Sequence, residues 1–188
     1  MTNFIEPYNT DWEIEFEDLK NIFYTELKEF EPDILHVGST SIPGLCAKPI
    51  LDIDIIIVNK SLLGVITSRL EKIGYLSKGE QGIMGRFAFR QLSNLAPSTY
   101  NNRKWQEHHL YVCFSGSLAL KKHILFRDTL LRDSELVNEY SQLKMNLIKE
   151  KGMTREKYTK RKTEFIISVL TSIGLDEKEL NEIKSANI

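Results

Sequence analysis

Apolar residues recur at three- to four-residue spacing over the first thirty positions, and polar residues fill the gaps. This pattern predicts a helix over residues 11–29, with Asn9 or Thr10 as its N-cap and acidic residues in its first turns. The apolar side chains of this segment share one helical face: Trp12, Phe16, Leu19, Phe23, Leu27 and Phe30. We interpret this face as part of the core, because an amphipathic helix buries its apolar stripe.

Beyond Pro32, which ends this helix, short apolar and β-branched runs predict strands. Residues 50–58 are nearly all apolar, and only Asp52 and Asp54 interrupt the run. We expect a central strand there, buried on both faces. Three other segments are strand-like: residues 34–37, 86–92 and 109–114.

The connections between these segments are rich in turn-forming residues. Residues 38–48 and 93–106 predict long loops, and residues 79–85 predict a hairpin connection. Residues 62–73 predict a helix with Ser61 as its N-cap. We expect the loop over residues 93–106 to be mobile and to border a cleft as a lid.

The last third of the chain has helical patterns only. Three helices are expected, over residues 117–132, 133–151 and 154–174, and a short one follows. We therefore predict an α+β fold, with a mixed core in residues 1–116 and a helical section in residues 117–188. The two parts should form one compact unit, because no flexible linker separates them.

Composition narrows the class of protein. With 188 residues, 41% of them hydrophobic, the chain can bury a sizeable core, and its net charge of −1 gives no sign of binding to extended nucleic acid. Two cysteines exclude a multi-disulfide secreted scaffold, and no apolar run is as long as a membrane span. Residues 1–8 lack the features of a signal peptide. We expect a cytoplasmic protein without membrane partners.

The charge is unevenly distributed along the chain. Residues 1–100 carry 9 basic and 14 acidic side chains, whereas residues 101–188 carry 16 and 12. The basic excess peaks over residues 144–162, with 8 basic and 2 acidic side chains. This segment is either a solvated helix face or a wall that binds a polyanion such as a phosphate chain.

A turn rich in glycine and hydroxyl side chains follows the first predicted strand. Gly38 and Ser39 stand at its start, and Thr40 and Ser41 follow. A glycine allows close backbone approach, and exposed amides with small hydroxyls suit phosphate oxygens. The alternative interpretation of the hydroxyls is a capped turn.

Two carboxylates interrupt the central predicted strand. Asp52 and Asp54 are two residues apart, so their side chains project from the same face. Two neighbouring carboxylates favour a cation between them, and oxygen ligands favour Mg²⁺ or Mn²⁺. Alternatively the acids are structural and bond to loop amides or to Lys48.

A Gly-Ser turn, a short spacer and Asp-x-Asp resemble the signature of the nucleotidyltransferase superfamily with the polymerase β-like fold. The longer string from His36 to Asp54, H-V-G-S-T-S-I-P-G-L-C-A-K-P-I-L-D-I-D, resembles the hallmark of the GrpB-like family, an uncharacterised protein family. The resemblance extends over most of residues 5–170. It implies a nucleotidyltransferase-like mixed β-sheet core with flanking helices and a C-terminal helical section. It also implies that Gly38 and Ser39 hold a triphosphate and that Asp52 and Asp54 hold metal ions.

The chain departs from the superfamily at one expected catalytic position. Active members generally carry a third carboxylate on a later strand, where this chain has His109 and Tyr111, with only Glu107 nearby. His109 is therefore a candidate catalytic residue, as a metal ligand or a base. The alternative is a histidine that is simply bonded within a polar cleft.

Basic side chains complete the predicted phosphate site. Arg86 and Arg90 are four residues apart in a predicted strand and share a face, and Lys48 lies near the acids in the sequence. Three more match family positions on the later helices: Arg127, Lys144 and Lys162. Arginine suits bidentate contacts with phosphate, whereas a surface ion pair or a solvated position is the alternative.

These patterns together favour a nucleotidyltransferase-like protein. We expect Mg²⁺- or Mn²⁺-dependent transfer of a nucleotidyl group from a nucleoside triphosphate to a small-molecule acceptor. The alternative is a catalytically degenerate nucleotide- or protein-binding module. Relatives of the family are fused to dephospho-CoA kinase in some bacteria, which extends this alternative to a link with coenzyme A metabolism. The sequence leaves the acceptor, the nucleotide preference and the oligomeric state open.

Overall fold

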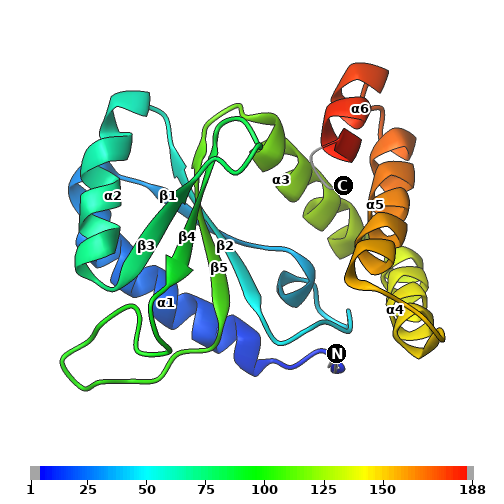
Figure 1. Cartoon of the computed structure of the whole chain (residues 1–188), viewed down its shortest axis with the longest axis horizontal. Coiled ribbons are helices and arrows are strands. Elements are labelled where there is room, and N and C mark those ends of the chain that lie inside the picture. Colours follow the sequence, from blue (N-terminus) through cyan, green and yellow to red (C-terminus); the bar gives the residue numbers. More distant parts are fainter. Residues whose placement is uncertain (1–4, 186–188) are drawn as a thin grey trace.

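A five-stranded mixed sheet forms the centre of the computed structural model, which describes residues 5–185 (Figure 1). The strands lie in the order β1-β2-β5-β4-β3. Their bounds are Asp33–Val37 for β1, Leu51–Ile57 for β2, Tyr75–Gly79 for β3, Arg86–Gln91 for β4 and His108–Phe114 for β5. Strands β2 and β5 are parallel, and the other neighbours are antiparallel. The two strands predicted to carry the polar site, β2 and β5, lie side by side at the centre of the sheet.

Two helices cover one face of the sheet. Helix α1 spans Asp11–Leu27 and helix α2 spans Leu63–Lys72. The apolar stripe of α1 packs in one cluster with the residues of β2 that alternate with the acids: Leu51, Ile53, Ile55 and Ile57. The predicted helical stripe and the predicted strand thus form the main core together, and the acids are left to face the other side.

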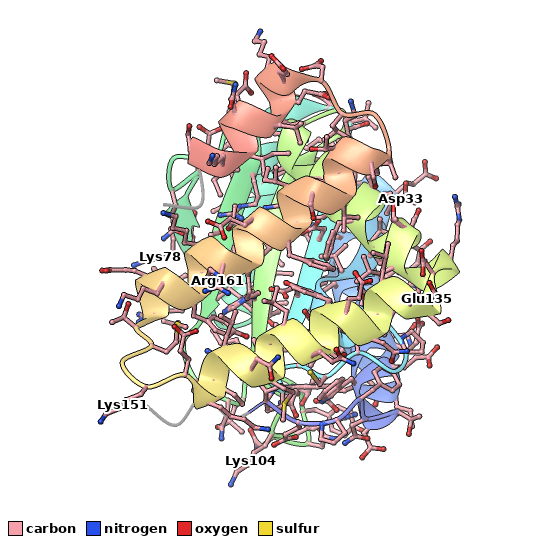
Figure 2. All side chains as sticks on the ribbon, turned by 90° about the vertical axis from the view of Figure 1, so that its right-hand side faces the viewer. Asp33, Lys78, Lys104, Glu135, Lys151 and Arg161 are labelled. Carbon is pink, nitrogen blue, oxygen red and sulfur yellow. The ribbon has the colours of Figure 1, made fainter. Side chains whose placement is uncertain are left out.

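Four helices lie on the other side of the sheet (Figure 1). They are α3 (Leu118–Arg132), α4 (Ser134–Lys149), α5 (Arg155–Ser172) and α6 (Glu177–Ser185). Figure 2 shows α4 and α5 side by side in front of the sheet, and α3 contacts β1 and β5. A second apolar cluster joins these helices to Ile42 and Leu45 of the loop that precedes β2. The expected α+β fold, a mixed sheet with flanking helices and a C-terminal helical section, is therefore present.

Local signals account for most of the helix starts. Ser117, Asp133 and Thr154 accept hydrogen bonds from backbone amides in the first turns of α3, α4 and α5. Ser61 was expected to cap α2, and this expectation is wrong. The side chain of Asn59 accepts from the backbone amide of Ser61 at 3.0 Å, so a turn of 3₁₀ helix precedes α2.

The expectation that residues 93–106 form a lid over the cleft is also wrong. Trp105 is 6% exposed and Ala96 is 2% exposed, and both belong to the core cluster on the α1 and α2 side. Arg103 forms ion pairs with Glu15 and Asp18 of α1. The loop is therefore anchored on the face opposite the acids (Figure 1).

No helix within residues 5–185 is long and apolar enough to cross a membrane. The division of the chain at residue 116 stays a prediction, and residues 1–4 and 186–188 at its two ends lie outside the described residues.

Candidate active site

The two acids of β2 lie on the sheet face that the helical section covers. Asp52 is paired with His109 of β5, and Asp54 is paired with Tyr111. Paired residues of neighbouring strands project from the same face, so four polar side chains meet there. The Asp54 side chain is 0% exposed, whereas that of Asp52 is 32% exposed. Asp52 is thus the acid that solvent or a ligand reaches more easily.

Gly38 places the end of β1 directly against Asp52. Its φ is +72°, and a Cβ atom on it would lie 2.2 Å from Oδ2 of Asp52. Any side chain would therefore collide with the carboxylate, and only glycine allows this approach. The turn that follows is a single 3₁₀ turn, Ser39–Ser41.

The predicted phosphate-binding hydroxyls of this turn divide into two groups. Thr40 is 1% exposed, and its Oγ1 lies 2.9 Å from Nε2 of His36. Ser41 donates its hydroxyl to the carbonyl of Gly38 at 2.7 Å. The structure uses both hydroxyls to hold the turn, which matches the alternative interpretation. Ser39 has a different partner: its Oγ accepts from Nζ of Lys144 at 3.2 Å.

Each acid is paired with a histidine. Nδ1 of His109 lies 2.9 Å from Oδ1 of Asp52, and Nδ1 of His123 lies 2.7 Å from Oδ2 of Asp54. A carboxylate only accepts, so we assign a proton to each Nδ1. These hydrogen bonds offset part of the free-energy cost of placing two acids in an apolar strand.

Charge around Asp52 stabilises its ionised form. Burial raises the pKa of Asp52. The hydrogen bond from His109 and the charges of His109, His123 and Lys162 together lower it by more, so the pKa lies below its usual value. The same hydrogen bond raises the pKa of His109 against the opposing effect of burial.

The carboxylates fit a hard divalent cation that a second ligand helps to hold. Oδ1 of Asp54 is buried and has no hydrogen-bond partner among residues 5–185. Within the same residues, no group of three His, Cys, Asp or Glu side chains could hold a metal ion, so the structure brings no third carboxylate to the pair. Mg²⁺ commonly binds through one or two carboxylates together with substrate phosphates. The donor set therefore fits Mg²⁺ or Mn²⁺ held jointly with a phosphate chain.

Three cations surround the acid pair from three elements. Arg86 of β4 lies over the ring of Tyr111 at 4.4 Å, and its Nε is buried without a partner among the described residues. Lys122 of α3 and Lys162 of α5 form no hydrogen bond or ion pair within residues 5–185. Burial lowers the pKa of Lys122 to about 8, and the charges of Arg86 and Lys162 contribute to the shift. Cations gathered in this way favour a polyanion between them.

The other predicted basic residues lie in different surroundings. Lys48 is exposed and its Nζ lies 5.6 Å from the centre of the Tyr158 ring. Arg90 is exposed on the strand that carries Arg86. Lys144 is 2% exposed, and it donates to the carbonyl of Cys46 as well as to Ser39. Burial lowers the pKa of Lys144 to about 7.

Arg127 does not join this cluster. Its guanidinium donates to the carbonyl of His36 at 3.0 Å and to the carboxylate of Asp128. It therefore braces α3 against β1 instead of facing the acids.

Sequence reasoning missed Lys122, the pairing of His123 with Asp54, and the contact of Tyr111 with Arg86. A signal for the first two was present. Lys122 and His123 fall between Ala119 and Phe126, which are buried residues of the inner face of α3. Polar side chains on a buried helix face need partners, and here His123 bonds to Asp54 while Lys122 lies near both acids.

The chain is similar in sequence to known bacterial proteins. The family model described as GrpB protein matches residues 3–172. The YqkA protein of Bacillus subtilis is 32% identical over 163 residues, which are 85% of this chain and 43% of that protein. The glutamate-rich protein GrpB of Alkalihalophilus pseudofirmus is 29% identical and is covered over 92% of its length. The chain thus spans less than half of the first relative and nearly all of the second.

Solved structures support the fold. The crystal structure of the conserved protein GrpB from Enterococcus faecalis has a TM-score of 0.73 and 26% identity, with 97% of this chain and 98% of that chain covered. GLD-2 in complex with RNP-8 has a TM-score of 0.58 at 15% identity, covering 92% of this chain and 53% of that one. Cid1, described by its RNA terminal uridylyl transferase activity, has a TM-score of 0.58 at 12% identity, covering 87% and 47%. At these identities the last two show a shared nucleotidyltransferase fold alone.

Proposed function

The chain belongs to the GrpB family, and we propose that it binds a nucleoside triphosphate and transfers the nucleotidyl group to a small-molecule acceptor, with Mg²⁺ or Mn²⁺ as cofactor. The arrangement of charges around the two acids carries this proposal. Asp52 and Asp54 share a face, Gly38 lies against Asp52, and cations without carboxylate partners in residues 5–185 surround the pair. Such a site is built for a phosphate chain together with a divalent cation.

The chain's own residues divide the binding between them. The backbone of Gly38 and the hydroxyl of Ser39 form the phosphate side of the site, with Lys144 behind Ser39. Lys162 approaches from α5 and lies close enough to influence the charge of Asp52. Asp52 and Asp54 would hold the divalent cation, which supplies charge neutralisation at the phosphoryl oxygens.

His109 is placed to take the proton of the acceptor. In the transfer, the acceptor hydroxyl oxygen forms a bond to the α-phosphorus, the bond from that phosphorus to the bridging oxygen breaks, and pyrophosphate leaves. In the neutral form of His109, Nδ1 donates to Asp52, so Nε2 is the ring nitrogen that can accept the hydroxyl proton. The side chain of His109 is 53% exposed, so an acceptor can reach it.

The test is a panel of nucleoside triphosphates with Mg²⁺, assayed for binding by calorimetry and for pyrophosphate release. We expect tight binding of at least one triphosphate and release of pyrophosphate when a competent acceptor is present. Asp52→Asn and Asp54→Asn should each lower turnover at least 100-fold, because each removes a charge from the reacting centre. Asp33→Asn, at an exposed position of β1, is the matched control and should behave as wild type. A wild-type protein that binds no triphosphate would contradict the proposal.

A second candidate is a module that binds the nucleotide without turnover, and its link to coenzyme A metabolism would then be one of docking or regulation. One observation favours it: among residues 5–185, the position expected for a third carboxylate holds His109. This candidate predicts Mg²⁺-dependent triphosphate binding with no pyrophosphate release for any acceptor tried.

A further inference from the structure

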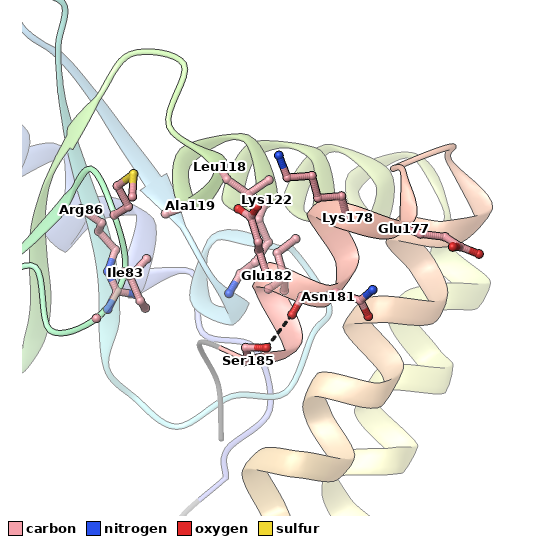
Figure 3. A pocket seen from close by; sticks show the side chains of 13 residues that line it. Ile83, Arg86, Leu118, Ala119, Lys122, Glu177, Lys178, Asn181, Glu182 and Ser185 are labelled. Carbon is pink, nitrogen blue, oxygen red and sulfur yellow. Dashed lines mark hydrogen bonds between the residues drawn. The ribbon is translucent and has the colours of Figure 1, made fainter.

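A large cavity lies beside the acid pair, between the turn that joins β3 to β4, the start of α3 and helix α6. Its volume is about 880 Å³. Figure 3 shows Arg86 and Ile83 on the sheet side, with Lys122 and Glu182 on the helix side. A volume of this size is in the range of small-molecule sites, and α6 forms one wall of the cavity.

Neither acid lines the cavity, but two of its lining residues, Arg86 and Lys122, lie near the acid pair. Arg86 lies over Tyr111, which is paired with Asp54 in the sheet. Lys122, on the opposite wall, lies near enough for the charges of Asp52 and Asp54 to act on it. Gly38 approaches Asp52 from β1, the strand on the other side of β2. An occupant of the cavity and a triphosphate at the Gly38 turn would therefore flank the same two acids.

The walls of the cavity carry cations that the described chain does not neutralise. The buried Nε of Arg86 has no partner among residues 5–185, and Lys122 has no ion pair there. An anionic ligand in the cavity would place negative charge beside these two cations, which the described chain does not pair with a carboxylate. The acidic members of the lining, Glu177 and Glu182, are exposed at the rim on α6.

A second cavity, of about 1080 Å³, shares Ile83 and Arg86 with the first. It extends along α5, and its lining includes four more basic residues and two acidic ones: Arg155, Lys157, Lys160, Lys184, Glu156 and Glu164. Arg86 thus stands at the junction of two cavities with an excess of positive charge.

We propose that the cavity between Arg86 and Lys122 is the subsite for the acceptor, and that this acceptor is a phosphorylated small molecule. The inference rests on the proposed function and names its second substrate class. A phosphate group can take two hydrogen bonds from the guanidinium of Arg86 and a third from Lys122 on the opposite wall. Its remaining part can contact the apolar side chains of Ile83, Leu118 and Ala119, which line the same cavity. In this proposal its hydroxyl lies at the end of the cavity nearer the acids.

The test measures binding of ribose 5-phosphate and glycerol 3-phosphate by calorimetry, each against its unphosphorylated counterpart. We expect the phosphorylated form to bind at least tenfold more tightly. Arg86→Gln and Lys122→Met should each weaken that binding at least tenfold, because each removes a cation from the wall of the cavity. Arg132→Gln, at the exposed end of the helix that carries Lys122, is the matched control and should bind as wild type. Arg86→Lys keeps the charge without the planar fork and covers the case in which Arg86→Gln does not fold.

Several outcomes would overturn the inference. Equal affinity for the phosphorylated and unphosphorylated forms would do so, and so would an equal loss in Arg132→Gln. Competition between the phosphomonoester and the triphosphate would assign the cavity to the triphosphate instead. If the phosphomonoesters bind and no triphosphate does, the proposed function fails while the phosphate subsite remains.

Discussion

Asp54 is the residue on which the electrostatics of the site depend most. It is 0% exposed, one oxygen accepts from His123, and the other has no partner within the described chain. A buried carboxylate is tolerated only where nearby donors or cations stabilise it. His123 and Lys122 come from adjacent positions of α3, so this one helix turn supplies both a hydrogen bond and a positive charge.

Removal of His123 should therefore destabilise the protein. We expect His123→Ala to lower the free energy of unfolding by about 3 kcal/mol, because the buried charge of Asp54 loses its imidazole donor. The double variant His123→Ala with Asp54→Asn should recover part of this loss, since the buried charge is then absent. Urea denaturation of both variants measures the effect. A loss below about 0.5 kcal/mol in His123→Ala would show that Asp54 does not depend on this partner.

Lys144 makes the stability of the protein depend on pH. Its pKa is about 7 in the folded chain, against an ordinary value of 10.5, because the side chain is buried. Between these two values the unfolded chain holds a proton that the folded chain has released, so stability rises with pH. Relative to Lys144→Met, the wild type should gain up to about 1.4 kcal/mol per pH unit above pH 7, the value for one proton. Denaturation series at pH 6, 7, 8 and 9 give the comparison, and parallel curves would contradict it.

At the scale of elements, the site is assembled where the end of β1, the middle of β2 and the inner face of α3 meet. The antiparallel pairing of β1 with β2 sets Val37 opposite Asp52, which brings the next residue, Gly38, against the carboxylate. The loop that follows buries Ile42 and Leu45 among the helices. The same short segment thus shapes the phosphate side of the site and joins the sheet to the helical section.

Gly38→Ala should damage both stability and binding, because the added Cβ atom collides with Oδ2 of Asp52 at a positive φ. Gly152→Ala is the matched control: Gly152 has a φ of +80° and no atom within 4 Å of an added Cβ in the described chain. The control should lose about 1 kcal/mol from backbone strain alone. Gly38→Ala should lose at least 1 kcal/mol more, as well as its triphosphate affinity. Equal losses in thermal unfolding would mean that Asp52 moves aside freely.

At the scale of the whole molecule, the chain has two apolar clusters with a charged layer between them. One cluster lies under α1 and α2, and the other lies among α3 to α6. The acids project from the sheet into this layer, and Arg86, Lys122 and Lys162 meet them from β4, α3 and α5. The acids of β2 are thereby brought together with Lys122 and Lys162 of the helices, although these lysines lie in the other half of the sequence.

Because only two carboxylates of the described chain meet at the candidate metal site, Mg²⁺ and a triphosphate should stabilise the protein jointly. We expect Mg²⁺ alone to raise Tm by less than about 1 °C, and Mg²⁺ with the triphosphate to raise it by several degrees through mass action. The double variant Asp52→Asn with Asp54→Asn should lose the Mg²⁺-dependent part and remain folded. A large shift with Mg²⁺ alone, equal in the variant, would place the metal elsewhere.

The sequence by itself determined most of the elements and one half of the site, but it did not predict the edge strand β3. Apolar periodicity predicted α1, β2 and the helical section, because burial of a stripe leaves a direct trace in residue spacing. The spacing of two between Asp52 and Asp54 predicted that they share a face, because strand geometry is local. Tertiary structure alone decided the other half. His123 bonds to Asp54 from α3, Lys122 of the same helix lies near both acids, and Arg86 of β4 lies over Tyr111, the partner of Asp54 in the sheet. The loop that contains Trp105 packs on the opposite face of the sheet. Such contacts depend on how whole elements pack against one another. No local sequence pattern encodes which distant residue a side chain will contact.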